Sequence, residues 1–158
     1  MDSWLPFFQW CEATALGHGI KQSPWLFPVI EAVHLLGLSA LGGTLLVVDL
    51  RMLGAGLRTR PIAELAQDVR PWLVGSLAVM ILTGTALFLS ESVKCYYSQA
   101  FWVKITTIPI AALFTLTVRQ RVATRAGMDA TVSTRLAAIV SVVLWFTVAA
   151  AGRWIGFS

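Results

Sequence analysis

The chain has 158 residues, of which 57% are apolar and only 13% are charged, and its mean hydropathy is +0.75. Soluble domains carry about 25% charged residues, so this composition excludes an ordinary soluble domain and predicts an integral membrane protein. The net charge is +4, but the basic residues lie in short segments between apolar runs. Because such a pattern orients membrane proteins, we expect no nucleic-acid partner.

The N-terminal segment is short and amphipathic. Residues 3–16 place Trp4, Phe7, Phe8 and Cys11 on one side of a helix and polar residues elsewhere. The pattern predicts a helix that lies on the membrane surface instead of crossing it, the alternative being a frayed apolar tail.

Four longer apolar runs follow, each with the ~17 to 25 residues that a helix needs to cross a bilayer. Because the hydrocarbon core offers no water to backbone groups, we expect each run to be helical. The predicted spans are residues 25–50, 71–91, 100–120 and 135–157. The predicted fold class is therefore all-α: one membrane domain over residues 1–158, an integral membrane four-helix bundle with an N-terminal interfacial amphipathic helix.

Arginines concentrate in the connections that follow the first and third spans. They are Arg51, Arg58, Arg60 and Arg70 in one, and Arg119, Arg121, Arg125 and Arg135 in the other. The positive-inside rule places both connections in the cytoplasm. We expect a multi-pass protein of a bacterial inner membrane with both termini in the periplasm. Cys11 and Cys95 then lie on the periplasmic side, as a disulfide or as free thiols.

Ionisable side chains inside a membrane span are costly, so each calls for an explanation. Glu31 and His34 are three residues apart and share one helix face, with His34 roughly 13 Å into its span. Lys104 and Arg153 stand at similar depth in the third and fourth spans. Together they predict a site in the outer half of the bilayer. The alternatives are that Lys104 and Arg153 snorkel to the headgroups and that His34 only hydrogen-bonds between helices.

A membrane histidine with cations from other helices suits a b-type haem. In this interpretation His34 ligates the iron, Arg153 and Lys104 meet the propionates, and Glu31 orients the imidazole or carries a proton. The second axial position stays open. His18, the other of the two histidines, is one candidate, and the remaining ones are Met80, Lys104 and a five-coordinate iron.

Several short motifs carry a resemblance to known families. They are EAVHLLG over 31–37, DLRMLG over 49–54, FWVK over 101–104 and AGRWIGF over 151–157. The chain resembles an uncharacterised bacterial family of four-helix membrane proteins and, more distantly, HemJ-type protoporphyrinogen oxidases and CopD-like copper-resistance membrane proteins. The HemJ-type resemblance implies a haem b-binding helical bundle in which His34 and Lys104 matter. Glu31 stands where that family has a lysine, so porphyrinogen oxidation is not carried over.

These features predict a haem b-binding electron-transfer protein that is a small subunit of a respiratory or redox complex, without independent catalysis. Its expected partners are the lipid bilayer, membrane or periplasmic redox proteins, and quinone. No catalytic residue is assigned. Two alternatives remain, namely a copper permease in which Glu31 and His34 bind the ion with His18 or Met80, and a structural membrane subunit.

Overall fold

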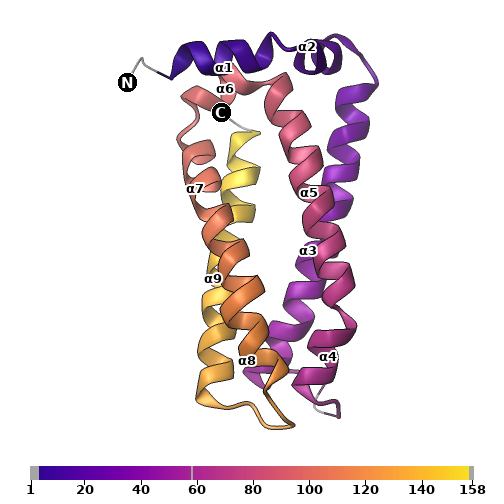
Figure 1. Ribbon diagram of the computed structural model, residues 1–158, viewed down its shortest axis with the longest axis vertical. Coiled ribbons are helices and arrows are strands. Elements are labelled where there is room, and N and C mark those ends of the chain that lie inside the picture. The colour runs from indigo at the N-terminus through magenta and orange to yellow at the C-terminus, as the bar shows by residue number, and fades with distance from the viewer. Residues whose placement is uncertain (1–3, 58, 157–158) are drawn as a thin grey trace.

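The computed structural model describes residues 4–57 and 59–156, and within these ranges it contains helices and no strand. Four long helical segments run the length of the molecule (Figure 1). They are α3 (Leu26–Leu53), α5 (Arg70–Ser90), α7 (Gln99–Phe114), which continues through the π-helix η1 (Thr115–Arg119) into α8 (Gln120–Thr124), and α9 (Val132–Ile155). The predicted all-α fold class is confirmed.

Large apolar side chains cover the outside of these four segments. Leu36 on α3 is 71% exposed and Phe146 on α9 is 73% exposed, and each segment is long and apolar enough to cross a membrane. Side chains of this kind, spread around the whole bundle, need a hydrocarbon environment to cover them. The chain is a multi-pass membrane protein.

The ends of the long helices follow from local backbone chemistry. The first span continues to Leu53 and stops at Gly54, whose φ of 83° is left-handed and suits glycine. The fourth begins three residues before the predicted start because the hydroxyl of Thr131 accepts the Thr134 N–H at 3.4 Å. Its predicted last residue, Phe157, lies outside the described residues.

The N-terminal segment forms two helices instead of the single predicted one. They are α1 (Leu5–Glu12) and α2 (Ala15–Gln22). The break falls at Thr14, whose hydroxyl accepts the Gly17 N–H at 3.2 Å and caps α2. Ser3, the predicted first residue, lies outside the described part. A Cβ at Gly17 would collide with the carbonyl of Leu89, so this glycine lets α2 rest directly on α5.

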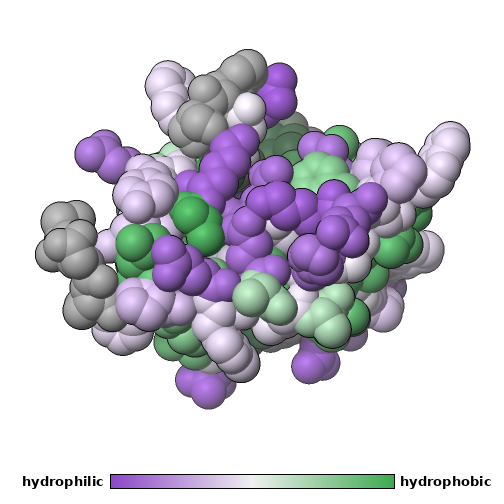
Figure 2. Space-filling model, turned by 90° about the horizontal axis from the view of Figure 1, so that it is seen from above, coloured by the Kyte–Doolittle hydropathy of each residue, from purple (hydrophilic) through white to green (hydrophobic). Residues whose placement is uncertain are grey.

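These two helices and the short α6 (Ser92–Tyr97) lie across one end of the bundle, which we call the capped end (Figure 1). Figure 2, which views the molecule from this side, shows hydrophilic side chains gathered over the middle of the end. Of the apolar face predicted for the N-terminal segment, Phe8 and Cys11 are buried against the bundle, whereas Trp4 and Phe7 are exposed.

The opposite end, which we call the arginine-rich end, holds α4 (Ile62–Asp68), α8 and the connections 54–61 and 125–131. Arg58 is outside the described residues. Helices α3, α4, α8 and α9 meet at this end in an apolar cluster. Its buried residues are Val48, Met52, Ile62, Leu65, Ala66, Ala123, Ala137 and Ala138.

Helix α3 is central to the packing, because it lies along both α5 and α9, while α9 also lies along α7. Helices α5 and α7 contact each other little. The bundle therefore consists of a first pair, α3 with α5, and a second pair, α7 with α9, joined through α3 and α9 (Figure 1).

Candidate functional site

His34 lies on α3, in the half of the bundle nearer the capped end, and its ring is oriented by α5. Its Nδ1 is 2.7 Å from the Oγ1 of Thr83. The single hydroxyl hydrogen of Thr83 is donated to the carbonyl of Val79 at 2.6 Å. The Thr83 oxygen must therefore accept a hydrogen from Nδ1, which leaves Nε2 with its lone pair available. An imidazole held in this way is arranged as a ligand or as a proton acceptor.

Two glycines allow this close packing of α3 on α5. A Cβ at Gly84 would lie 3.3 Å from the Cε1 of His34, and a Cβ at Gly37 would lie 3.1 Å from a methyl carbon of Val79. Both distances are tighter than ordinary van der Waals contact. The small residues thus bring the imidazole against the α5 backbone, within reach of Thr83.

Lys104 approaches the same region from the second helix pair. Its side chain runs along α9, where a Cβ at Gly152 would be 3.2 Å from Nζ. Lys104 is half-buried, as His34 is. Of the sequence-predicted residues, these two are partly enclosed by the bundle, and they come from opposite helix pairs.

The other predicted residues lie on the surface of the described structure. Glu31 is exposed on the first turns of α3, and Arg153 is exposed near the end of α9. His18 is exposed on α2, within a helix and not in the expected loop. None of the three has a hydrogen bond to His34 among the bonds of the described residues. Of the predicted residues, His34 and Lys104 are thus the two that are partly buried, and Thr83 is a partner of His34 that the sequence analysis did not identify.

The capped end closes this half of the bundle. The Glu12 carboxylate pairs with Lys21 and accepts the Val93 N–H at 3.0 Å. The hydrogen bond with Lys21 lowers the pKa of Glu12. Burial acts in the opposite direction, and the hydrogen bond from the Val93 N–H lowers the pKa further.

Cys11 and Cys95 are buried free thiols at the same end. Burial, with a smaller contribution from Glu91, raises the pKa of Cys95 to about 11.

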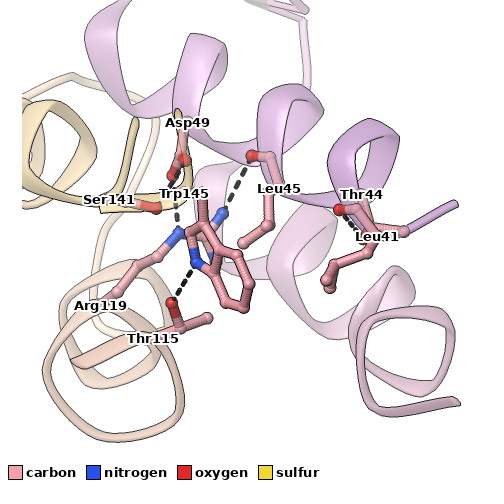
Figure 3. A network of polar contacts seen from close by, with 8 residues as sticks. All are labelled: Leu41, Thr44, Leu45, Asp49, Thr115, Arg119, Ser141 and Trp145. Carbon is pink, nitrogen blue, oxygen red and sulfur yellow. Dashed lines mark hydrogen bonds and ion pairs between the residues drawn. The ribbon is translucent and has the colours of Figure 1, made fainter. Parts of the chain in front are cut away.

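A second polar network, which the sequence analysis did not predict, lies closer to the arginine-rich end (Figure 3). Arg119 donates from Nε to Asp49 Oδ1 at 2.6 Å and from a terminal nitrogen to the Leu45 carbonyl at 3.0 Å. Ser141 donates to the other carboxylate oxygen of Asp49 at 2.7 Å. Both charged side chains are 1% exposed. Arg119, the last residue of η1, therefore joins the third segment to α3 from inside the bundle and does not lie in the surface connection, while Asp49 links α3 to α9 through Ser141.

The π-helix η1 positions Arg119 for this pairing. One extra residue in a helical turn rotates the side chains that follow, and such turns often occur at functional sites. Thr115, the first residue of η1, accepts a hydrogen bond from the Trp145 indole at 2.9 Å. The signal available in the sequence was an aspartate and an arginine at similar depth in two spans, which was interpreted as marking the span ends.

Arg51 is also buried, although the sequence analysis placed it in a cytoplasmic connection. It donates to the Arg60 carbonyl at 2.8 Å and to the Met128 carbonyl at 2.6 Å. Because these carbonyls belong to the two connections of the arginine-rich end, Arg51 ties those connections together. Its guanidinium satisfies backbone groups that no helix bonds.

The types of side chain near His34 bear on which metal group could bind there. Within residues 4–57 and 59–156 there is no group of three or more histidine, cysteine, aspartate or glutamate side chains that could hold a metal ion. A bare copper or zinc ion needs several protein ligands. A haem needs as few as one axial ligand, because the macrocycle supplies the other donors. One histidine with a free Nε2 would meet the protein's share of haem ligation.

Comparison with curated proteins and with solved structures gave no significant match. The model of one protein family matches residues 7–158, which cover α2 to α9 and nearly all of α1. The chain belongs to that family, DUF6644, a family of unknown function.

Proposed function

We propose that the protein is a haem b-binding membrane electron carrier, in which the Nε2 of His34 ligates the iron. The observation that carries the proposal is the hydrogen-bond chain from His34 Nδ1 through Thr83 to the Val79 carbonyl. It selects the tautomer with a free Nε2 and prevents the ring from turning, as second-shell partners of ligating histidines do. A bound haem would supply a one-electron carrier within the membrane.

Lys104 is the second group that we assign to this site. Its position between α7 and α9 allows it either to pair with a haem propionate as an ammonium ion or to complete the iron coordination as a free amine. Helices α5 and α7 contact each other little, so a flat group on this side would displace few contacts between helices. The resemblance to HemJ-type oxidases at His34 and Lys104 supports the same assignment.

The alternative functions have less support. A copper permease needs a multi-ligand ion site, and the described residues contain no group of three candidate ligands. The arginine-rich connections favour a bacterial inner membrane with both termini in the periplasm. In that orientation the His34 region lies in the outer half of the bilayer, where it can exchange electrons with a periplasmic protein or with quinone.

The visible spectrum of the purified protein tests the proposal. Protein expressed with a haem supply, or reconstituted with hemin, should show a Soret band, and reduction with dithionite should sharpen its α band. His34→Ala should abolish both. The matched control is His18→Ala, which removes an exposed histidine and should leave the spectrum unchanged. A wild-type protein without a Soret band after reconstitution would show that the proposal is wrong.

Two further variants separate the roles of Thr83 and Lys104. Thr83→Val removes the acceptor of the Nδ1 hydrogen, so haem should stay bound with a higher midpoint potential, because the ligand becomes less basic. Lys104→Arg keeps the charge and cannot ligate. If Lys104 is an axial ligand, Lys104→Arg converts the spectrum from low-spin to high-spin. If Lys104 pairs with a propionate, Lys104→Arg keeps the wild-type spectrum, whereas Lys104→Met weakens haem retention.

A further inference from the structure

A groove opens at the arginine-rich end, between the two helix pairs. Its volume is about 470 Å³, and its walls come from α4 and the start of α5 on one side and from η1 and α8 on the other. The lining residues are Gln67, Arg70, Leu116, Gln120, Arg121 and Thr124. The groove is separate from the His34 region, which lies nearer the capped end.

The lining is positively charged without a compensating carboxylate. Arg70 and Arg121 are exposed and come from opposite walls. Within the described part of the chain neither forms a salt bridge, in contrast to Arg60 with Asp68 and Arg119 with Asp49. Two guanidinium groups that face one hollow, each with several N–H donors, favour an oxyanion with more than one acceptor oxygen.

Gln120 provides an independent indication of a ligand. Its amide nitrogen is buried, and among the described residues it has no hydrogen-bond partner. A buried N–H group without an acceptor is costly, and this side chain lines the groove. The neighbouring Thr124 hydroxyl donates to the carbonyls of Gln120 and Arg121, at 2.9 and 3.3 Å. With the Gln120 side chain turned into the groove, an oxyanion there would supply the missing acceptor.

The position of the groove indicates that the anion belongs to a lipid. Trp72, two residues after Arg70, is 69% exposed, as expected for a ring at the headgroup level. Leu116 lines the groove, and Leu113, about one helical turn before it, is exposed as well. A molecule in the groove thus meets arginines at one end and an apolar helix surface at the other. A phospholipid has this distribution of polarity, whereas a soluble phosphate does not.

We propose that this groove binds the phosphodiester group of an anionic phospholipid, with Arg70 and Arg121 on the phosphate oxygens and Gln120 as a further donor. The lining has no carboxylate to receive the ammonium group of a zwitterionic lipid, so the site selects anionic headgroups such as phosphatidylglycerol. Because the two arginines come from opposite helix pairs, the bound lipid bridges α5 and α8.

Native mass spectrometry of the detergent-purified protein with added lipid tests this proposal. Wild-type protein should retain phosphatidylglycerol and release phosphatidylcholine. In the variant Arg70→Gln with Arg121→Gln, the affinity for phosphatidylglycerol should fall by at least about tenfold, because two charge-assisted contacts are lost. The control is Arg125→Gln with Arg135→Gln, which removes the same charge from exposed positions outside the groove and should bind as wild type.

Two additional measurements separate the source of the anion from a folding effect. Inorganic phosphate at the same concentration should not displace the lipid, and efficient displacement would show that the site takes soluble phosphate instead. The melting temperature without lipid should match between the groove variant and its control. If it does not, Gln120→Leu replaces the pair as the test, and it should weaken phosphatidylglycerol binding. Equal retention of phosphatidylglycerol by the groove variant and the control variant would overturn the proposal.

Discussion

Asp49 and Arg119 show what a charged residue requires inside this bundle. Moving either ion out of water costs several kcal/mol, and only close pairing with additional hydrogen bonds compensates for it. Asp49 and Arg119 are closely paired, and each has an additional hydrogen bond. Asp49 accepts one from the Ser141 hydroxyl, and Arg119 donates one to the Leu45 carbonyl. The interaction is therefore stabilising only while both partners are present.

Removing one partner should be far more damaging than removing both. We expect Asp49→Ala to lower the free energy of unfolding by about 3–5 kcal/mol, because it leaves the Arg119 guanidinium buried and unpaired. Asp49→Leu combined with Arg119→Met should cost clearly less than Asp49→Ala. Equilibrium unfolding in mixed detergent micelles with increasing dodecyl sulfate measures both changes.

The exposed pair of Arg60 and Asp68, with 3.1 Å between Nη1 and Oδ2, is the natural control. Both side chains are more than half exposed, so Asp68→Ala should change the free energy of unfolding by less than ~1 kcal/mol. A similar cost for Asp49→Ala and Asp68→Ala would contradict the assigned importance of burial.

At the scale of elements, Glu12 connects three helices of the capped end. It belongs to α1, pairs with Lys21 of α2 and accepts the backbone N–H of Val93 in α6. Short helices of this size are marginal alone, and these polar contacts supplement the apolar packing of Phe8, Cys95 and Phe101. The cap therefore depends in part on an ionised carboxylate.

This dependence predicts a pH effect with a definite sign. The pKa of Glu12 is lower in the folded protein than its ordinary value, chiefly because of the hydrogen bond with Lys21. Its stabilisation is therefore fully present above the ordinary glutamate pKa and is lost as the pH falls through the lowered one. Glu12→Gln should melt below wild type at pH 7, and the difference should vanish in acid. A difference that persists or grows on acidification would contradict the assignment.

At the scale of the whole molecule, the two ends of the bundle differ in a way that fits a single orientation of the protein in the membrane. One end presents the cap, and the other carries the arginine-rich connections with Trp72 beside them. Because basic connections are retained on the cytoplasmic side, the orientation that we propose puts the His34 region in the periplasmic half and the groove of Arg70 and Arg121 in the cytoplasmic leaflet.

Cysteine labelling measures this orientation directly. In a background with Cys11 and Cys95 replaced by alanine, a membrane-impermeant maleimide should label Gln22→Cys in intact cells. It should label Gly127→Cys only after the membrane is opened. Both positions are exposed, one at each end of the bundle. The reverse pattern would invert the proposed topology and place the His34 region on the cytoplasmic side.

Much of the architecture could be predicted from the chain alone, because the bilayer imposes strong constraints. Apolar runs long enough to cross the membrane must be helical there, and the four predicted spans coincide with the long helices to within a few residues at most ends. The division of the N-terminal segment at Thr14 was not predicted. The apolar pattern of residues 3–16 is compatible with one continuous helix, and a threonine within it can equally cap a new helix.

The polar contacts of His34 and Arg119 depend on how each helix is rotated about its axis and on which helices pack together. The hydropathy of the sequence does not specify either. The sequence by itself determined the helical membrane fold and singled out His34 and Lys104, because lipid makes any ionisable side chain conspicuous. Only the tertiary structure decided that Thr83 orients His34 and that Glu31 faces outward. It also decided that Arg119 turns inward to Asp49. The physical reason is that the partner of a buried polar group is chosen by helix rotation and packing between segments far apart in the chain.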